Sequence, residues 1–217
     1  VADATVKAVL IGARGKTFCV GGDLQDFLSN RNRMRAHVLD MASSFHAAIT
    51  YLRNGPAPVI IAVNGIAAGG GFSLVLNADM AIAKRSAKLV AAYTRSGLSP
   101  DGGGTWFLPR LVGLQKAFDL FATNPTLTAD EALRLGMLSR VVDDDKFDAE
   151  VATLVQSIID APPGALTSLK KLLRGSASAG FEQQLAAEAE TIAESASRPS
   201  TLQKLDQFVA ERSGKTK

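Results

Sequence analysis

Short runs of apolar, often β-branched residues alternate with glycine-rich turns and helical stretches along the first two thirds of the chain. Four of these runs are long enough to predict buried strands, at residues 6–11, 58–63, 78–83 and 138–142. Between the first two runs, apolar side chains recur at helical spacing over residues 33–52, which predicts an amphipathic helix. Strands that are separated by helices favour an α/β fold with largely parallel pairing.

From about Phe147 onward the pattern becomes helical. Just before it, Thr128 and Glu131 form a capping-box pattern that predicts a short helix ending at Gly136. Helix breaks are expected at residues 162–164 and 175–180, and further helices at residues 181–196 and 202–209. We therefore expect a core over residues 1–145 and a helical C-terminal subdomain over residues 146–217, which packs on the core or on a neighbouring subunit.

Composition and charge narrow the class of protein. Of 217 residues, 47% are hydrophobic and 21% are charged, which is typical of a soluble globular protein and excludes global disorder. The net charge of +3, without a continuous basic stripe, argues against nucleic-acid binding. Cys19 is the only cysteine, which excludes an internal disulfide and a thiolate zinc site and suits a cytoplasmic location. No apolar run reaches the roughly 18–20 residues of a membrane span, and no signal peptide is visible.

Three glycine-rich segments, at residues 18–24, 67–73 and 97–105, are candidates for a functional site. Glycine at a strand end tolerates positive φ and lets a ligand approach backbone N–H groups, two of which can hold a developing negative oxygen. One such segment alone is more often a tight turn. Two at successive strand ends, with Asp101 in the third, favour an active site. The two histidines, His37 and His46, lie in the predicted amphipathic helix, and we interpret both as packed or solvated side chains.

The segments read Phe-x-x-Gly-x-Asp-Leu, Asn-Gly-x-Ala-x-Gly-Gly-Gly and Gly-Leu-x-Pro-Asp-x-Gly-Gly-Thr, in that order. In this pattern the chain resembles the enoyl-CoA hydratase/isomerase (crotonase) superfamily over nearly its whole length. The resemblance implies a crotonase-type ββα superhelix with a helical C-terminal subdomain that forms homotrimers or dimers of trimers. It also implies an acyl-CoA thioester substrate, with coenzyme A as part of the substrate and no separate cofactor or metal. Family members usually have some tens of residues before Val6, so we expect a fragment or a processed form.

The family's common step is stabilisation of a thioester enolate by two backbone N–H groups. By position, the resemblance assigns these donors to Gly22 and Gly70. It also implies that residues around Val20 line an adenine pocket, with Lys16 or the basic residues 31–35 near the coenzyme A phosphates. The residues expected to contact the substrate are Val20, Gly21, Asp23, Leu24, Gly69, Ser73, Tyr93, Leu98 and Trp106.

The reaction depends on the acid and base groups. Hydratases of the family use two glutamates, whose positions fall here on Ser73 and near Tyr93, so simple hydration of a 2-enoyl-CoA is not expected. Asp101 matches the aspartate of the family's dienoyl-CoA isomerases and 1,2-epoxyphenylacetyl-CoA isomerases. The resemblance therefore implies an isomerase in which Asp101 removes a proton beside the thioester and returns it further along the chain.

Other interpretations remain open from the sequence. Asp101 is also a suitable cap for a helix that begins at Gly102. The chain is alternatively a divergent hydratase in which Ser73 or Tyr93 orients water. A dehalogenase or thioester hydrolase would use Asp101 as a nucleophile, but it would need a water-activating base, and no nearby histidine is evident. A non-catalytic acyl-CoA-binding or RNA-binding member of the family is the last alternative.

Overall fold

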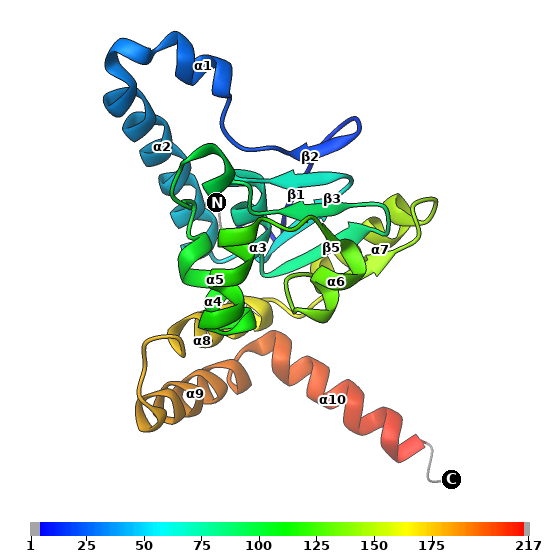
Figure 1. Ribbon diagram of the computed structural model, residues 1–217. Coiled ribbons are helices and arrows are strands. Elements are labelled where there is room, and N and C mark those ends of the chain that lie inside the picture. The colour runs from blue at the N-terminus through cyan, green and yellow to red at the C-terminus, as the bar shows by residue number, and fades with distance from the viewer. Residues whose placement is uncertain (1–4, 215–217) are drawn as a thin grey trace.

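The computed structural model describes residues 5–214 of the chain (Figure 1). The strands are β1 (Val9–Gly12), β2 (Thr17–Cys19), β3 (Val59–Val63), β4 (Ile66–Ala68), β5 (Met80–Lys84), β6 (Lys88–Val90), β7 (Leu127–Thr128) and β8 (Arg140–Val142). The helices are α1 (Leu24–Ser29), η1 (Arg31–Arg33), α2 (Met34–Asn54), α3 (Gly70–Leu76), η2 (Thr94–Ser96), α4 (Gly104–Val112), α5 (Leu114–Thr123), α6 (Ala129–Arg134), α7 (Phe147–Ile159), α8 (Ala165–Gly175), α9 (Phe181–Ala196) and α10 (Pro199–Gly214).

The strands form two sheets, and the chain visits the sheets in turn. One sheet has the order β1-β3-β5-β8 and is parallel throughout, while the other has the order β2-β4-β6-β7 with only the last pair antiparallel. The predicted α/β class and the largely parallel pairing are therefore confirmed. All four predicted strands belong to the first sheet, and each begins one to three residues later than predicted. The sequence analysis missed the second sheet because its strands have only two or three residues.

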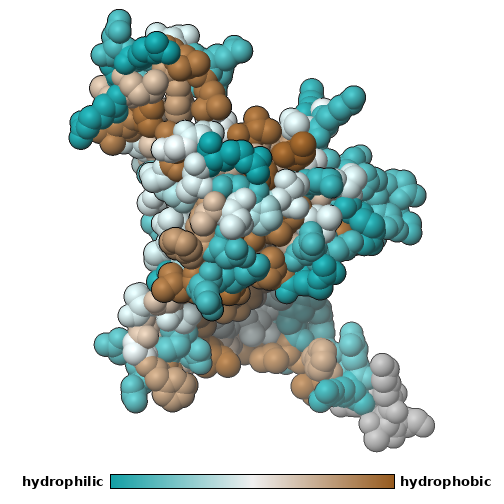
Figure 2. Space-filling view, in the orientation of Figure 1, coloured by the Kyte–Doolittle hydropathy of each residue, from teal (hydrophilic) through white to brown (hydrophobic). Residues whose placement is uncertain are grey.

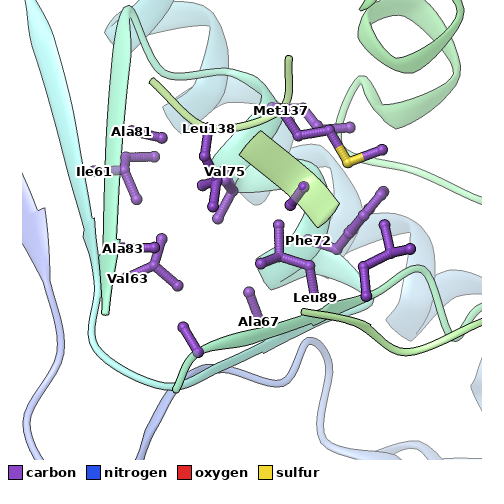
Figure 3. Close-up of a cluster of buried hydrophobic side chains, with 14 of the residues drawn as sticks. Ile61, Val63, Ala67, Phe72, Val75, Ala81, Ala83, Leu89, Met137 and Leu138 are labelled. Atoms are coloured by element: carbon purple, nitrogen blue, oxygen red, sulfur yellow. The ribbon is translucent and has the colours of Figure 1, made fainter. Parts of the chain in front are cut away.

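Strand β3 lies at the centre of the core and is buried at all five positions. Alternate side chains of a strand point to opposite faces. Ile61 and Val63 therefore face the space between the sheets, where they meet side chains of β5, β6 and α3 (Figure 3). Ile60 faces the other way and packs with Phe147 and Leu154 of α7. Because both faces are covered, the strand is continuously apolar, and this is why it was predictable.

A buried cation joins α8 to the core. Lys170 donates from Nζ to the carbonyl oxygens of Ala57 at 2.7 Å and Leu52 at 2.9 Å, and pairs with Asp79 Oδ2 at 2.9 Å. Arg174, one turn later, pairs with the other oxygen of Asp79 at 2.5 Å. Burial lowers the pKa of Lys170, whereas the pairing with Asp79 opposes that shift. The helix is thus fixed by polar contacts that only a cation at this position can satisfy.

Helices α9 and α10 extend away from the two sheets (Figure 1). The predicted helix over residues 181–196 is confirmed, and α10 is longer than predicted because it begins at Pro199. Their large apolar side chains are exposed at Phe181, Leu185, Ile192, Leu202, Leu205, Phe208 and Val209. The division into a core and a subdomain stays a prediction. Within residues 5–214, no helix combines the length and the apolar character needed to cross a membrane.

Candidate active site

The first two glycine-rich segments meet because they follow neighbouring strands. Strands β2 and β4 are parallel, and Cys19 pairs with Ala67. The register shifts between Thr17 and Cys19, which is an irregularity that bends a strand and redirects the residues after it. Both strands end at the same edge of the sheet, so the two glycine segments leave it side by side.

The two segments approach each other at backbone distance. At Gly21, whose φ is +90°, a Cβ atom would lie 3.0 Å from the Gly70 nitrogen and 3.3 Å from the Ala68 oxygen. A Cβ atom at Gly71 would overlap the carbonyl group of Cys19. Glycine is therefore required at both positions for steric reasons. Any side chain there would separate the two segments.

The amide N–H groups of Gly22 and Gly70 are free to bind a ligand oxygen. Gly70 is the first residue of α3, so its N–H has no acceptor within the helix, and Gly69 precedes it with a φ of +52°. Within the described part of the chain, neither amide donates to a backbone or side-chain acceptor. Two unpaired amides at one sheet edge can stabilise a negative oxygen.

Asp101 lies in the loop between η2 and α4, and it is held by a chain of hydroxyl groups. The Tyr93 hydroxyl donates to Asp101 Oδ1 at 2.7 Å and lies 2.9 Å from Ser73 Oγ. Burial raises the pKa of Tyr93 well above its usual range, so the phenol keeps its proton and acts as a hydrogen-bond donor. Ser73 in turn donates to the phenolic oxygen. The second carboxylate oxygen, Oδ2, makes no hydrogen bond with the residues that the structure describes.

The structure also shows that Asp101 does not cap a helix. Helix α4 begins at Gly104, its N-cap is Gly103, and no side chain caps it. Gly102 and Gly103 have φ values of +60° and +78° and insert a non-helical turn after Asp101. The capping interpretation is therefore wrong, because the carboxylate points to Tyr93 instead.

His46 is the functional candidate that the sequence analysis missed. Its Nε2 atom accepts a hydrogen bond from the Gly102 N–H at 3.1 Å and lies 3.4 Å from Asp101 Oδ2. His46 is 48% exposed, which agrees with a solvated side chain, but the expectation that no histidine lies near Asp101 is wrong. The two contacts join segments that are distant in the sequence, so no local pattern could reveal them. His37, in contrast, pairs with Asp26 at 2.5 Å where α1 meets α2.

Two cavities border this site. A cavity of about 670 Å³ is lined by Leu24, Phe27, Leu28, Met34, Arg35, Val38, Leu39, Ala42, Ser96 and Leu98. A second cavity of about 360 Å³ is lined by His46, Ile49, Thr50, Arg53, Asn77, Gly102, Gly103, Trp106 and Phe107. Figure 2 shows hydrophobic side chains on the lobe that α1 and the start of α2 form, where the larger cavity lies.

The cavities separate the apolar residues that the sequence assigned to one substrate site. Leu24 and Leu98 line the larger cavity, whereas Trp106 lines the smaller one. The indole ring of Trp106 has the Arg53 guanidinium at 4.4 Å from its centroid and the Arg110 guanidinium at 3.8 Å. Leu98 and Trp106 therefore line different cavities. Trp106 serves as a platform for two cations.

The other predicted contact residues have varied surroundings. The Asp23 carboxylate accepts from the amides of Gln25 at 2.8 Å and Asp26 at 3.3 Å, which makes it the N-cap of α1. Ser73 is fully buried and reaches Asp101 only through Tyr93, so it does not present a surface to a ligand. Val20 is exposed. Among the residues of known placement, no three His, Cys, Asp or Glu side chains are grouped to hold a metal ion.

Two interleaved sheets, a pair of unpaired glycine amides and a positioned carboxylate define an α/β protein with a candidate site for a developing negative oxygen. A model of the family described as enoyl-CoA hydratase/isomerase matches residues 2–215. The chain belongs to this enoyl-CoA hydratase/isomerase family, the crotonase superfamily, and the predicted family and fold are confirmed.

Relatives within the family carry different activities in their names. The chain is 34% identical to the 1,2-epoxyphenylacetyl-CoA isomerase of Escherichia coli (strain K12), over 84% of this chain and 70% of that protein. It is 28% identical to the 4-chlorobenzoyl coenzyme A dehalogenase-1 of an Arthrobacter species, over 95% of this chain and 75% of that protein. The crystal structure of an enoyl-CoA hydratase from Polaromonas sp. JS666 matches with a TM-score of 0.91 at 31% identity, over 96% of this chain and 81% of that one. Family membership therefore leaves the reaction undetermined.

Proposed function

We propose that this protein is an acyl-CoA isomerase that shifts a double bond, or opens an epoxide ring, beside the thioester. The observation that carries the proposal is the hydrogen bonding of the Asp101 carboxylate. One of its oxygens is held by Tyr93, and the other is not hydrogen-bonded by the residues that the structure describes. The two positions of the hydratase glutamates hold Ser73 and Tyr93, which are poor bases at neutral pH. A single positioned carboxylate suits proton transfer between two carbons better than activation of water.

The proposed reaction uses the three glycine-rich segments together. The amides of Gly22 and Gly70 bind the thioester oxygen and stabilise the negative charge that develops on it when Asp101 removes a proton. Loss of one such donor typically costs about 2.7–4 kcal/mol in the barrier. Asp101 Oδ2 then returns the proton to a more distant carbon. The hydrogen bond from Tyr93 to Oδ1 keeps the carboxylate turned so that Oδ2 is the reacting atom.

The surroundings of the site support an acyl-CoA as the substrate. The larger cavity is lined mainly by apolar side chains of α1 and α2, which suits an acyl group of moderate size. Exposed Val20 and the basic residues Lys16, Arg31, Arg33 and Arg35 are available for the adenine and phosphate groups of coenzyme A. The exposed apolar faces of α9 and α10 support the homotrimer or dimer of trimers that the family resemblance implies, and a cytoplasmic location is part of the same proposal.

A second candidate reaction is dehalogenation or thioester hydrolysis. The observation that favours it is His46, because its imidazole lies 3.4 Å from Asp101 Oδ2 and offers the base that such a reaction needs. In this case Oδ2 would attack the substrate carbon, the leaving group would depart, and water activated by His46 would cleave the resulting ester.

A spectrophotometric assay with a 3-enoyl-CoA and a 2-enoyl-CoA tests the proposal. Wild type is expected to convert the 3-enoyl substrate without hydrating the 2-enoyl one, and Asp101→Asn is expected to lose the conversion. Asp160→Asn, an exposed carboxylate at the end of α7, serves as the matched control and keeps wild-type activity. Hydration of the 2-enoyl-CoA that survives Asp101→Asn would overturn the isomerase. An acyl-CoA-binding or RNA-binding protein would bind its ligand equally well in both variants and catalyse neither reaction.

A further inference from the structure

We propose that His46 relays the substrate-derived proton from Asp101 to solvent, so that the transferred hydrogen exchanges with water during turnover. The inference rests on the proposed role of Asp101 as the proton-transfer group. It assigns a function to a side chain that the isomerase mechanism above does not use.

The hydrogen bonding of His46 fixes its resting state. Nε2 accepts the Gly102 N–H at 3.1 Å, so Nε2 carries no proton and the ring proton is on Nδ1. The same Nε2 lone pair is 3.4 Å from Asp101 Oδ2. While Asp101 is ionised, these two atoms are both acceptors, and no hydrogen bond forms between them.

Protonation of Asp101 changes this relation. When Oδ2 takes a proton from the substrate, it becomes a donor that faces the Nε2 lone pair at 3.4 Å. A movement of either side chain by a few tenths of an ångström brings the two atoms to hydrogen-bond distance. The proton then moves from Oδ2 to Nε2, and the hydrogen bond from Gly102 is released. The imidazolium loses this Nε2 proton to water in the smaller cavity, and a solvent proton takes its place on Nε2. The solvent proton passes back from Nε2 to Oδ2, which delivers it to the more distant carbon. One proton therefore leaves and one enters in each turnover, and both side chains regain their resting charges.

The two sides of the carboxylate differ in their access to water. On the Oδ1 side, Tyr93 is 8% exposed and its other partner, Ser73, is 0% exposed, so a proton has no exit in that direction. On the Oδ2 side, the His46 side chain is 48% exposed and lines the smaller cavity. Arg53 lines the same cavity. Exchange with water therefore takes place on the Oδ2 side, where His46 lies and where the Asp101 side chain is itself 34% exposed.

Turnover of a 3-enoyl-CoA in D2O tests the relay, with mass spectrometry of the product at low conversion. Wild type is expected to place solvent deuterium in the product. His46→Gln retains an oxygen that can accept the Gly102 N–H but cannot carry a proton. This variant should convert the substrate within about tenfold of wild type, with deuterium per turnover reduced several-fold. His37→Gln, a change at the histidine that pairs with Asp26, is the matched control and should keep the wild-type deuterium content.

His46→Ala provides a second measurement that does not depend on the glutamine variant folding or turning over. Free imidazole added to His46→Ala is expected to restore the deuterium content. Equal deuterium in wild type and His46→Gln, little deuterium in wild type, or no restoration by imidazole would each overturn the relay. These results are distinct from failure of the proposed function, which is shown by conversion that survives Asp101→Asn.

Discussion

Tyr93→Phe isolates the hydrogen bond that orients the reacting carboxylate. The change removes one oxygen atom and keeps the aromatic ring, which is 8% exposed. Two contacts are lost, the donation to Asp101 Oδ1 at 2.7 Å and the contact with Ser73 Oγ at 2.9 Å. The first affects the charged form of Asp101, and the second leaves a buried hydroxyl without its partner.

The two lost hydrogen bonds affect different quantities, the first the rate of reaction and the second the stability of the fold. A hydrogen bond to a charged group is worth about 1.5–3 kcal/mol. Because the Asp101 side chain is 34% exposed, water replaces part of that bond, and we expect about 1.5 kcal/mol. At 1.36 kcal/mol per factor of ten, this equals a loss of about tenfold in kcat/KM. The unpaired Ser73 hydroxyl is expected to lower the free energy of unfolding by about 1–2 kcal/mol.

The assay is the measurement of kcat/KM together with a thermal unfolding curve. Tyr51→Phe is the matched control, because Tyr51 is the chain's other tyrosine and is 71% exposed. The kcat/KM should fall about tenfold in Tyr93→Phe, because the carboxylate is no longer held with Oδ2 as the reacting atom, and it should stay at the wild-type value in Tyr51→Phe. A stability loss with an unchanged kcat/KM would refute the reasoning, since the hydroxyl would then serve packing alone.

Three further predictions concern stability. Gly71→Ala should abolish folding into the native state, because the added Cβ atom overlaps backbone atoms, and a circular dichroism melt tests this. Gly136→Ala is the control. Its Cβ atom lies in open space at a φ of +75°, so the free energy of unfolding should fall by only about 1–2 kcal/mol. Lys170→Met should lower the free energy of unfolding in urea by about 3–5 kcal/mol, because the buried acceptors of Lys170 lose their partner. Lys171→Met, at an exposed position, is the control. Equal losses in the two variants would contradict the role of Lys170 in joining α8 to the core. The pKa of Glu131 is lowered from 4.5 by hydrogen bonds within the capping box, so its contribution to stability is present above that pH and lost as pH falls through the lowered value. Glu131→Gln should flatten the Tm-against-pH curve in that range, and an unchanged slope would show that the capping box does not contribute.

Features determined by neighbouring residues were predictable from the sequence. The capping box at Thr128 and Glu131 is present because both partners lie within one helical turn. Strand β3 was predictable because both of its faces are buried and every residue is apolar. The glycine segments were recognisable because their backbone conformations and close approaches allow few other residues. The resemblance to the family added the assignment of Gly22, Gly70 and Asp101, which no local rule supplies.

Features that depend on distant segments were not predictable. The three-residue strand β4 is too short for an alternating pattern to appear, so the second sheet stayed hidden. His46 lies on α2, and its contact with Gly102 spans 56 residues of sequence. Only the tertiary placement of α2 against the loop brings this imidazole to Asp101. The same placement separates Trp106 from Leu98, although the two are close in the sequence.

The pairing of β2 with β4 has a consequence for how such a site can diversify. Neighbouring strands in a sheet lie about 4.7–4.9 Å apart, so the spacing of Gly22 and Gly70, which follow these strands, is a property of the sheet rather than of the intervening chain. Helices α1 and α2 lie in the segment of chain between β2 and β3, so they follow Gly22 and precede Gly70. Changes in the length or sequence of this segment reshape the larger cavity while the two amides keep their separation. The fold thus uncouples the choice of acyl group from the chemistry performed on it.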